Sequence, residues 1–426
     1  MKMPFVVQPN LGPKQLRRYA LHMDSDESGW HRRWTESIWR RHQCPQNAAL
    51  SGWKSPDDGR RRLIHFYDEY GVEGGHFVLR NAYLSINLTL PAPDIAEYRA
   101  CIRERALQGG WRLVEEGSQS ESWSRGDLRA ELSGYSLHPE DAARGKQYPA
   151  GYRHLELRVF SAGYPMPGGL EQRPWRWFHE VGLRDVAAPG RPRHVAPEEI
   201  ASHLPAQIEL GCGPSTEAGI SHLSTLHRIY GVSRADYSFV FHPADDNALE
   251  VLSDPESKYR EMTTIYRGCI MAEPTPFYIG LADLWRRGHF VGPVITNNFD
   301  CLCADMGLPE TSLRRYDSEP YFPMYRSGAP GEVPIHPDAK SLLVIGVHAD
   351  RRMAQRFARR KGLRVMYIDP ERYISPDGSI IPYAVESPQD TDLFVRMPAG
   401  QAMPRLYRAL TGCEIPSGSF ASTEQA

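Results

Sequence analysis

The stretch that most constrains the fold of this chain reads IELGCGPSTEAGI and covers residues 208–220. It opens with a short apolar run and bends through Gly211 and Gly213 into a segment that begins with a proline. Glycine accepts a positive φ and lets the backbone approach a ligand closely. The pattern predicts a buried strand that ends in a glycine turn and passes at once into a helix. The free N–H groups at the start of such a helix favour a phosphate.

The residues after the turn can complete the start of this helix. We expect Ser215 or Thr216 to cap it, because a hydroxyl oxygen can accept a hydrogen bond from an unpaired N–H group of the first turn. Glycine turns also join strands to helices in proteins that bind no phosphate, so the turn alone leaves both interpretations open.

The composition is that of a soluble globular protein of two or three domains, with 426 residues, 41% hydrophobic and 24% charged. The net charge of -2 favours neither a nucleic-acid partner nor an acidic solvating tail. No apolar run approaches the roughly 20 residues that span a membrane. The opening residues MKMPFVVQPN lack the apolar core of a signal peptide. We therefore expect a cytoplasmic protein without a membrane segment.

Cysteine usage argues against a disulfide framework and against structural zinc. The seven cysteines are odd in number and widely spread along the chain. No CxxC pair is present, and the two-residue spacing of Cys301 and Cys303 suits packing on one strand face better than half of a zinc site. We expect no metal site.

Residues 1–190 are interpreted as an α+β domain with an antiparallel sheet. A helical segment over residues 94–106 stands among strand-like segments at residues 76–90, 111–115, 122–133 and 152–161. A boundary rich in Pro and Gly follows over residues 163–197. We expect no catalytic site in this domain, because its histidines have no acid–base partner at a telling spacing.

The first 60 residues are rich in tryptophan and arginine, and Trp30, Trp34 and Ile38 are spaced for one face of a helix. Aromatic and basic residues together can also form a surface that binds nucleic acid. Because the chain as a whole is not basic, we favour a helix that docks its tryptophans and expect no nucleic-acid partner.

Strands and helices alternate over residues 191–415, which predicts a doubly wound parallel sheet with helices on both faces. Beyond the first strand, the expected strands cover residues 291–296, 341–347 and 364–368, and the expected helices cover residues 197–204, 277–287, 351–361 and 400–410. Residues 416–426 are expected to form a flexible tail.

Four expected strands end in residues that suit a dinucleotide, and ligands of open parallel sheets bind beyond such ends. The ends carry a glycine turn, a cluster of amides with a carboxylate, a second close backbone approach and an acid placed for a ribose diol. In chain order these are Gly211 to Gly213, then Thr296 with Asn297, Asn298 and Asp300, then Gly346 with His348, and finally Asp369.

On these residues the chain resembles the sirtuin family. GCGPSTEAGI is similar to the family's GAGxSxxSGI, and EPTPFYIGLADLWRRGHFVGPVITNNFD resembles the helix and strand that precede its TQNID motif. LLVIGVHA stands where the family has its GTS strand, and VMYIDPE where a strand ends in an Asn that holds the adenosine ribose. DLFVRMPAGQAMPRLYRAL resembles the closing segment. The resemblance covers about residues 195–415 and does not extend to residues 1–190.

The resemblance implies a sirtuin-like, Rossmann-like fold and NAD as cofactor, with the glycine turn lining the pyrophosphate. The residues that it assigns to the cofactor are Gly211, Cys212, Gly213, Ser215, Ile220, Thr296, Asn297, Gly346, His348 and Asp369. Asn298 and Asp300 would lie at the nicotinamide and its ribose. Asp369 replaces the family's Asn, and its carboxylate can accept from both ribose hydroxyls. The same charge would repel a 2′-phosphate, which favours NAD over NADP.

The departures from the family bear on the chemistry. After GI the family continues PDFR, whereas this chain reads SHLS, and the family's zinc-binding CxxC pairs are missing. The catalytic histidine, expected in an HG pair, is also missing. Tyr316 stands near its place, and His336 is the nearest histidine downstream. The candidate catalytic residues are therefore Asn298, Asp300, Tyr316 and His336. Without an obvious base, deacylation is the part of the family's activity most in doubt.

The leading hypothesis is an NAD-consuming enzyme that cleaves the nicotinamide–ribose bond and passes ADP-ribose to water or to an acceptor. The first alternative is an NAD-dependent deacylase of a protein or small molecule with a displaced base, and the second is a non-catalytic NAD or nucleotide sensor. The sequence specifies neither the acceptor nor the oligomeric state.

Overall fold

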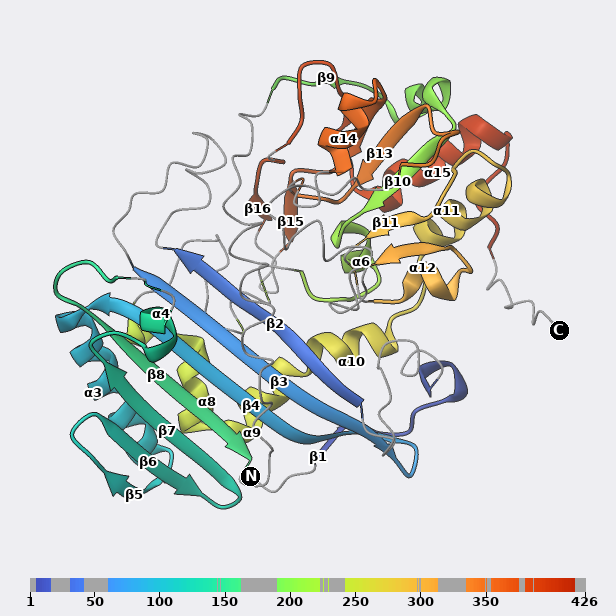
Figure 1. Cartoon of the computed structure of the whole chain (residues 1–426). Helices are drawn as coiled ribbons and strands as arrows, with labels where there is room; N and C mark the ends of the chain where they lie inside the picture. Colours follow the sequence, from blue (N-terminus) through green and yellow to red (C-terminus); the bar gives the residue numbers. More distant parts are fainter. Residues whose placement is uncertain are drawn as a thin grey trace. The chain divides into compact units, whose positions relative to one another are not determined.

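The computed structural model describes residues 5–16, 31–41, 60–143, 145, 147–161, 190–222, 225, 229, 242–296, 298, 300–312, 335–348, 350, 354–374, 380–385 and 387–417. By its contacts the chain divides into two compact units, each described below by itself (Figure 1). The first contains Met1–Pro45, Lys54–His179 and Ser224–Arg267, and the second contains Gln46–Trp53, Glu180–Leu223 and Gly268–Ala426. The expected boundaries, 1–190 and 191–415, did not include the return of residues 224–267 to the first unit.

The first unit is built on an eight-stranded antiparallel sheet with the order β2-β3-β4-β8-β7-β6-β5 and with β1 paired to β4. The strands are β1 (Phe5–Gln8), β2 (His31–Arg41), β3 (Arg61–Glu73), β4 (His76–Pro91), β5 (Arg112–Glu116), β6 (Ser120–Arg125), β7 (Leu128–Tyr135) and β8 (Tyr152–Ser161). The expected antiparallel sheet is confirmed, and the single strand expected over residues 122–133 is a hairpin of β6 and β7.

Long-range pairing explains one wrong expectation. Trp30 lies outside the described residues, but Trp34 and Ile38 of the expected helix lie on strand β2, which pairs with β3 over nearly its whole length. Helical spacing of a few aromatic residues is a weak signal, and pairing with a neighbouring strand overrides it.

The first unit also contains helices. They are α3 (Ala92–Gln108), α4 (Pro139–Ala143), α8 (Glu250–Ser253) and α9 (Pro255–Met262), with the 3-10 turns η2 (Pro243–Asp245) and η3 (Asn247–Leu249). Helix α3 packs against β4, β8 and α8. Leu84, Ile86 and Leu157 lie on paired strands and are buried, and Tyr83 and Ser85, which point to the opposite face of β4, are buried as well.

A buried ion pair explains why residues 242–262 belong to the first unit. The guanidinium of Arg62 on β3 donates from Nη2 to Asp246 Oδ1 at 2.6 Å and from Nε to Asp246 Oδ2 at 3.0 Å. The two side chains are 2% and 0% exposed, and the Tyr98 hydroxyl on α3 also lies 3.4 Å from Asp246 Oδ2. Next to α8, Trp111 Nε1 donates to the Leu252 carbonyl at 2.7 Å. These bonds connect residues 242–262 to the sheet and to the segment around α3.

The second unit contains a seven-stranded parallel sheet with the order β12-β11-β10-β13-β14-β17-β9. Its strands are β9 (Arg193–His194), β10 (Ala206–Leu210), β11 (Val294–Thr296), β12 (Glu310–Ser312), β13 (Ser341–Ile345), β14 (Arg364–Ile368) and β17 (Leu393–Val395). Numbered along the chain from β10, the order becomes 3-2-1-4-5-6, the strand order of Rossmann folds. Strand β9 adds one edge strand, and β15 (Arg372–Ile374) pairs with β16 (Ile380–Pro382) as a separate hairpin.

Helices cover both faces of this sheet. All five residues of β13 are buried, and because successive side chains of a strand point to opposite faces, both faces must be covered. The helical elements are η1 (Pro197–His203), α6 (Gly213–Glu217), α11 (Pro276–Arg286), α12 (Leu302–Asp305), α14 (Ala354–Arg360) and α15 (Ala399–Thr411). Helix α14 packs on β13 and β14, while α15 packs on α11, η1 and α6. Helix α10 (Thr264–Met271) carries the chain from the first unit into the second.

In the part of the chain that the structure describes, no helix is long and apolar enough to cross a membrane. The same residues contain no group of three or more His, Cys, Asp or Glu side chains arranged to hold a metal ion.

Candidate functional site

The candidate site lies where the order of the parallel strands reverses. Strands β10 and β13 are neighbours, yet from β10 the chain moves on to β11 on one side, and from β13 it moves on to β14 on the other side. Loops that leave in opposite directions open a crevice at the carboxyl ends of the two strands, where dinucleotides bind in such folds. The paired residues Leu210 and Ile345 end the two strands, and Gly211 and Gly346 follow them.

Three glycines bring the two loops into direct backbone contact. Gly211 N–H donates to the Ile345 carbonyl at 2.9 Å, and Gly213 N–H donates to the Gly346 carbonyl at 3.3 Å. A Cβ on Gly211 would lie 2.1 Å from the Gly346 carbonyl oxygen, and Gly346 itself has φ +61°. No other residue fits such contacts without a shift of the backbone. The contact between the loops therefore explains these glycines without a ligand.

The helix that follows the turn differs from the expectation. Helix α6 has only five residues, its N-cap is Cys212, and no side chain caps it. Thr216 Oγ1 donates to the Gly213 carbonyl at 2.7 Å, and Ser215 Oγ donates to Asp300. The expected cap by Ser215 or Thr216 is wrong, because both hydroxyls bind elsewhere. A helix of one turn also has too small a dipole to attract a phosphate by itself.

Four polar side chains form a hydrogen-bonded group at the ends of β10 and β11. Asn298 Nδ2 donates to the Gly211 carbonyl at 2.7 Å and to Ser215 Oγ at 3.2 Å. Ser215 Oγ donates to Asp300 Oδ2 and lies 3.2 Å from the Tyr278 hydroxyl. The structure thus brings together Ser215, Asn298 and Asp300, which were expected here. It adds Tyr278 of α11, which no acid–base spacing in the sequence singles out.

Asp300 is the buried acceptor of this group. Its side chain is 5% exposed, and besides the Ser215 hydroxyl it accepts from the Leu302 N–H at 3.0 Å. Burial and the charge of Asp300 raise the pKa of Tyr278 well above its ordinary value, so this phenol stays protonated. In this structure both Asp300 oxygens accept from protein groups, so the carboxylate orients Ser215. The expected contact of Asp300 with the nicotinamide ribose stays a prediction.

Thr296 joins two of the strand ends. Its Oγ1 donates to the Leu210 carbonyl at 2.9 Å and accepts from the Asn298 N–H at 3.0 Å. Because the side chain is 1% exposed, Thr296 fixes the backbone of Asn298 in this structure.

Asp369, at the end of β14, carries an unpaired buried oxygen. Its Oδ1 accepts from the Glu371 N–H at 2.7 Å and from the Tyr383 hydroxyl at 2.8 Å. Its Oδ2 is buried and has no hydrogen-bond partner. Burial raises the pKa of Asp369 to about 7, and the charge of Glu371 adds to this rise while the two hydrogen bonds oppose it. A buried carboxylate oxygen without a donor fits a ligand hydroxyl that supplies one.

Aromatic rings from four segments gather near Asp369. His222 stacks on Tyr373 with ring centres 4.0 Å apart, and His348 meets Tyr383 edge to face at 5.4 Å. Tyr373 and Tyr383 lie 6.3 Å apart. Burial, with a smaller effect of His348, lowers the pKa of His222 to about 4, so His222 is neutral at pH 7. The sequence singled out His348 alone, since the hairpin that carries both tyrosines has no motif.

Two further sequence candidates lie outside the described residues, and a third lies away from this site. Tyr316 and Asn297 lie outside the described residues. His336 lies at the amino ends of the parallel strands, opposite to this site. Its N–H donates to the Oε1 atom of Gln207, near the start of β10, at 2.8 Å. The interpretation of His336 as a displaced base is therefore not supported, because a chain that enters β13 from residue 336 approaches the amino ends of the strands. Ile220 is buried at the end of the α6 turn, and its N–H donates to the Ser215 carbonyl at 3.2 Å.

No family model and no curated protein sequence matches this chain. Among solved structures, it is similar to a Sir2 homologue mutant in complex with ADP ribose, with 18% identity, 50% of this chain and 96% of that chain covered, and a TM-score of 0.31. It is also similar to Sir2Tm bound to a propionylated peptide, with 16% identity, 49% and 94% covered, and a TM-score of 0.29. A complex of Sir2, a p53 peptide and NAD+ matches with 17% identity, 49% and 94% covered, and a TM-score of 0.28. The chain is thus similar to Sir2 sirtuin structures over about half of its length, and at these scores the likeness does not assign its chemistry.

Proposed function

We propose that the second unit binds NAD and cleaves its nicotinamide–ribose bond, passing ADP-ribose to water or to an acceptor. The observation that supports this proposal is that three features occur together at the carboxyl ends of the parallel strands. These are the strand order of a dinucleotide fold, the hydrogen-bonded group around Asn298, and the unpaired carboxylate oxygen of Asp369.

Asp369 would hold the adenosine ribose. Its Oδ2 atom lacks a hydrogen-bond donor, and a ribose diol offers two hydroxyl donors. The neighbouring rings of His222, His348, Tyr373 and Tyr383 offer the flat apolar surfaces against which a nucleobase packs. An ionised Asp369 would repel a 2′-phosphate, so we propose NAD rather than NADP.

Asn298 would act at the opposite, nicotinamide end. Its side-chain amide is oriented by the two bonds that Nδ2 donates, to the Gly211 carbonyl and to Ser215 Oγ. Ser215 is itself oriented by Asp300. A side chain fixed in this way can hold a ribose hydroxyl or a water in one orientation, and such pre-organisation is a main source of catalytic rate.

NAD, when bound, would supply an ADP-ribosyl group whose bond to nicotinamide can break. The protein's contribution is to orient that bond and to stabilise positive charge on the sugar through carboxylate and carbonyl oxygens. Asp300 lies one hydrogen bond away, through Ser215, and supplies negative charge there.

Hydrolysis or transfer suits the described residues better than deacylation does. Deacylation needs a base that deprotonates a ribose hydroxyl. His336 lies at the amino ends of the strands beside Gln207, away from Asn298 at the carboxyl end of β11. An NAD-dependent deacylase remains the first alternative, and a non-catalytic NAD sensor the second.

The test is incubation of the full-length protein with NAD, followed by mass-resolved chromatography of the products. Nicotinamide and ADP-ribose in equal amounts, lost in Asn298→Ala, are the expected result. Release that requires an acylated substrate and yields O-acyl-ADP-ribose would favour the deacylase. A rise in melting temperature with NAD but without turnover would favour the sensor, and no shift in large excess would refute NAD binding altogether.

A further inference from the structure

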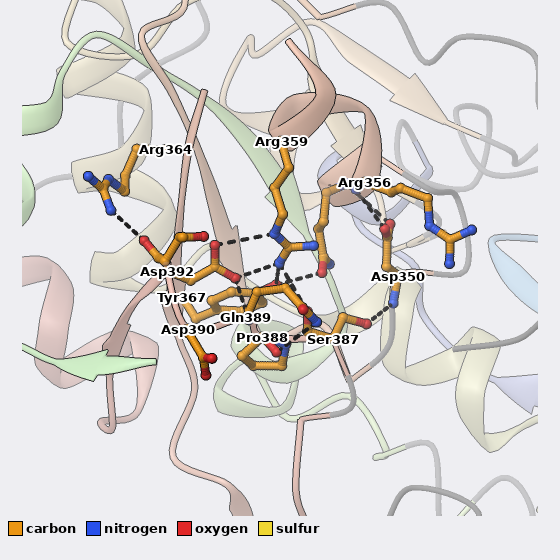
Figure 2. A network of polar contacts seen from close by, with 12 residues as sticks. Asp350, Arg356, Arg359, Arg364, Tyr367, Ser387, Pro388, Gln389, Asp390 and Asp392 are labelled. Atoms are coloured by element: carbon orange, nitrogen blue, oxygen red, sulfur yellow. Dashed lines mark hydrogen bonds and ion pairs between the residues drawn. The ribbon is translucent and has the colours of Figure 1, made fainter. Parts of the chain in front are cut away.

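A polar network of the second unit lies between β10, α14, β14 and residues 387–392 (Figure 2). It contains none of the residues assigned above to ligand contact. Its members are Glu209, Asp350, Gln355, Arg356, Arg359, Tyr367, Ser387, Gln389 and Asp392.

Arg359 of α14 is the centre of this network. Its guanidinium forms two hydrogen bonds with the carboxylate of Asp392, which is 1% exposed, and donates from Nη2 to the Ser387 carbonyl at 3.0 Å. Asp392 also accepts from the Gln389 N–H at 2.7 Å. A bidentate pair between guanidinium and carboxylate fixes orientation as well as distance. Residues 387–392 are therefore folded around Arg359, and the position of Ser387 follows from it.

Ser387 binds Asp350 in the loop that joins β13 to α14 and begins at Gly346. Its Oγ accepts from the Asp350 N–H at 2.8 Å. Asp350 in turn accepts from the N–H groups of Gln355 at 3.2 Å and Arg356 at 2.9 Å, at the start of α14. The near end of the same loop is fixed by the contact of Gly346 with the glycine turn after β10. Gly346 and Asp350 of this loop are thus each held by a contact outside the loop, and Ser387 supplies one of these two contacts.

The network also reaches β10. Burial raises the pKa of Tyr367 well above its ordinary value, so its hydroxyl stays protonated and donates to Gln355 Oε1 at 2.8 Å. It accepts from Arg359 Nη2 at 2.6 Å. Gln355 Nε2 then donates to Glu209 Oε2 at 2.9 Å, two residues before Gly211. Strand β10 and Asp350 of the loop after β13 are therefore both connected to Arg359 through this network.

We propose that Arg359 and Ser387 are positioning residues of the dinucleotide site, which hold the β13–α14 loop in the conformation that the ligand meets. The identity of the ligand rests on the proposed function, whereas the order of the loop does not. A network that only stabilised the fold would change unfolding and leave the loop and the affinity alone. A positioning network would instead change the loop and the affinity while leaving unfolding of the unit largely unchanged.

The decisive variant is Ser387→Ala, which removes the acceptor of the Asp350 N–H and leaves the pair of Arg359 and Asp392 intact. In the full-length protein without ligand, amide hydrogen exchange of residues 346–350 is expected to become faster, while exchange in β13 and β14 stays unchanged. The KM for NAD is expected to rise about three- to tenfold, the size of one neutral hydrogen bond, at an unchanged kcat. Ser387→Thr keeps a hydroxyl and is expected to restore both values.

Arg360→Ala is the matched control. Arg360 follows Arg359 on α14, but it stacks on the Phe357 ring at 4.4 Å and takes no part in the network. Its replacement is expected to change neither loop exchange nor KM. Faster exchange throughout the second unit in Ser387→Ala, or no change in exchange and KM, would overturn the proposal. If the wild-type protein does not use NAD, the proposed function fails, and loop exchange in Ser387→Ala still decides the positioning role.

Discussion

The replacement Asp369→Asn tests the side chain on which the cofactor assignment depends most. Burial raises the pKa of Asp369 from an ordinary value of 3.8 to about 7. The folded protein therefore binds this proton more tightly than the unfolded chain does. The stability that follows is fully present below about pH 4 and is lost as the pH rises through about 7.

The magnitude follows from the size of that shift. A difference of about three pKa units, at about 1.4 kcal/mol for each, amounts to about 4 kcal/mol over the whole titration. About 3 kcal/mol of this falls between about pH 5 and pH 8, since the unfolded group is already ionised at pH 5. Asparagine keeps an oxygen that can accept from the Glu371 N–H and the Tyr383 hydroxyl, but it does not titrate. The variant is therefore expected to lack this part of the pH dependence.

The assay is urea unfolding of the wild type and of Asp369→Asn at several pH values. Unfolding is monitored by hydrogen exchange of the β14 amides, so that the second unit is observed alone. The difference in the free energy of unfolding between the two proteins should change by about 3 kcal/mol in favour of the variant from pH 5 to pH 8. A difference that is independent of pH would refute the buried, ionisable state of Asp369. If a ribose hydroxyl of NAD donates to Oδ2, wild-type affinity should also rise with pH through about 7, and the affinity of the variant should not.

Three further changes have defined outcomes. His336→Ala should leave nicotinamide release unchanged within about twofold, because His336 lies at the amino edge of the sheet; a loss as large as that of Asn298→Ala would restore His336 as a base. Gly211→Ala should lower the melting temperature of the second unit and cost about 1–3 kcal/mol or more, since the added Cβ would lie 2.1 Å from a carbonyl oxygen; an unchanged melting temperature would contradict the loop contact. Asp246→Ala should cost about 3–5 kcal/mol in the first unit, because it removes the carboxylate that pairs with the buried guanidinium of Arg62. Calorimetry measures this loss, and a cost below about 1 kcal/mol would show that water or another group satisfies Arg62.

The parallel sheet could be predicted because its information is local. Short apolar runs that end in glycine or in polar clusters mark buried strands, and β10, β13 and β14 lie where the sequence predicts them. The antiparallel sheet was predicted from one helical segment among several strand-like segments, of which residues 76–90 alternate in sequence. The return of residues 224–267 to the first unit could not be predicted, because it depends on a long-range ion pair. Neither Arg62 nor Asp246 stands in a motif, and their chemistry appears only when β3 and η3 are adjacent.

The part of the site that depends on glycine turns was predicted from the sequence. The part that depends on side chains brought together by packing was not predicted. Gly211 and Gly346 stand out in the sequence, and the structure excludes other residues at both, by the close backbone contact at Gly211 and by the positive φ of Gly346. The stack of His222 on Tyr373 was not predicted, because the two residues are about 150 positions apart in the sequence. They meet only where the hairpin of β15 and β16 packs near His222. Likewise, Tyr278 joins Ser215 only through the packing of α11.

The glycine contact changes which residue supports a cofactor. From the sequence, Gly211 and Gly213 pointed to a phosphate, but in the structure their space is filled by the backbone of Gly346, so they are explained without a ligand. Asp369 is different, because it carries the only buried carboxylate oxygen in the described part of the chain that lacks a hydrogen-bond partner. Leaving such an oxygen unpaired costs stability in the free protein, and a ligand hydroxyl can recover that cost on binding. The NAD assignment therefore depends more on Asp369 than on the glycine motif that first suggested it.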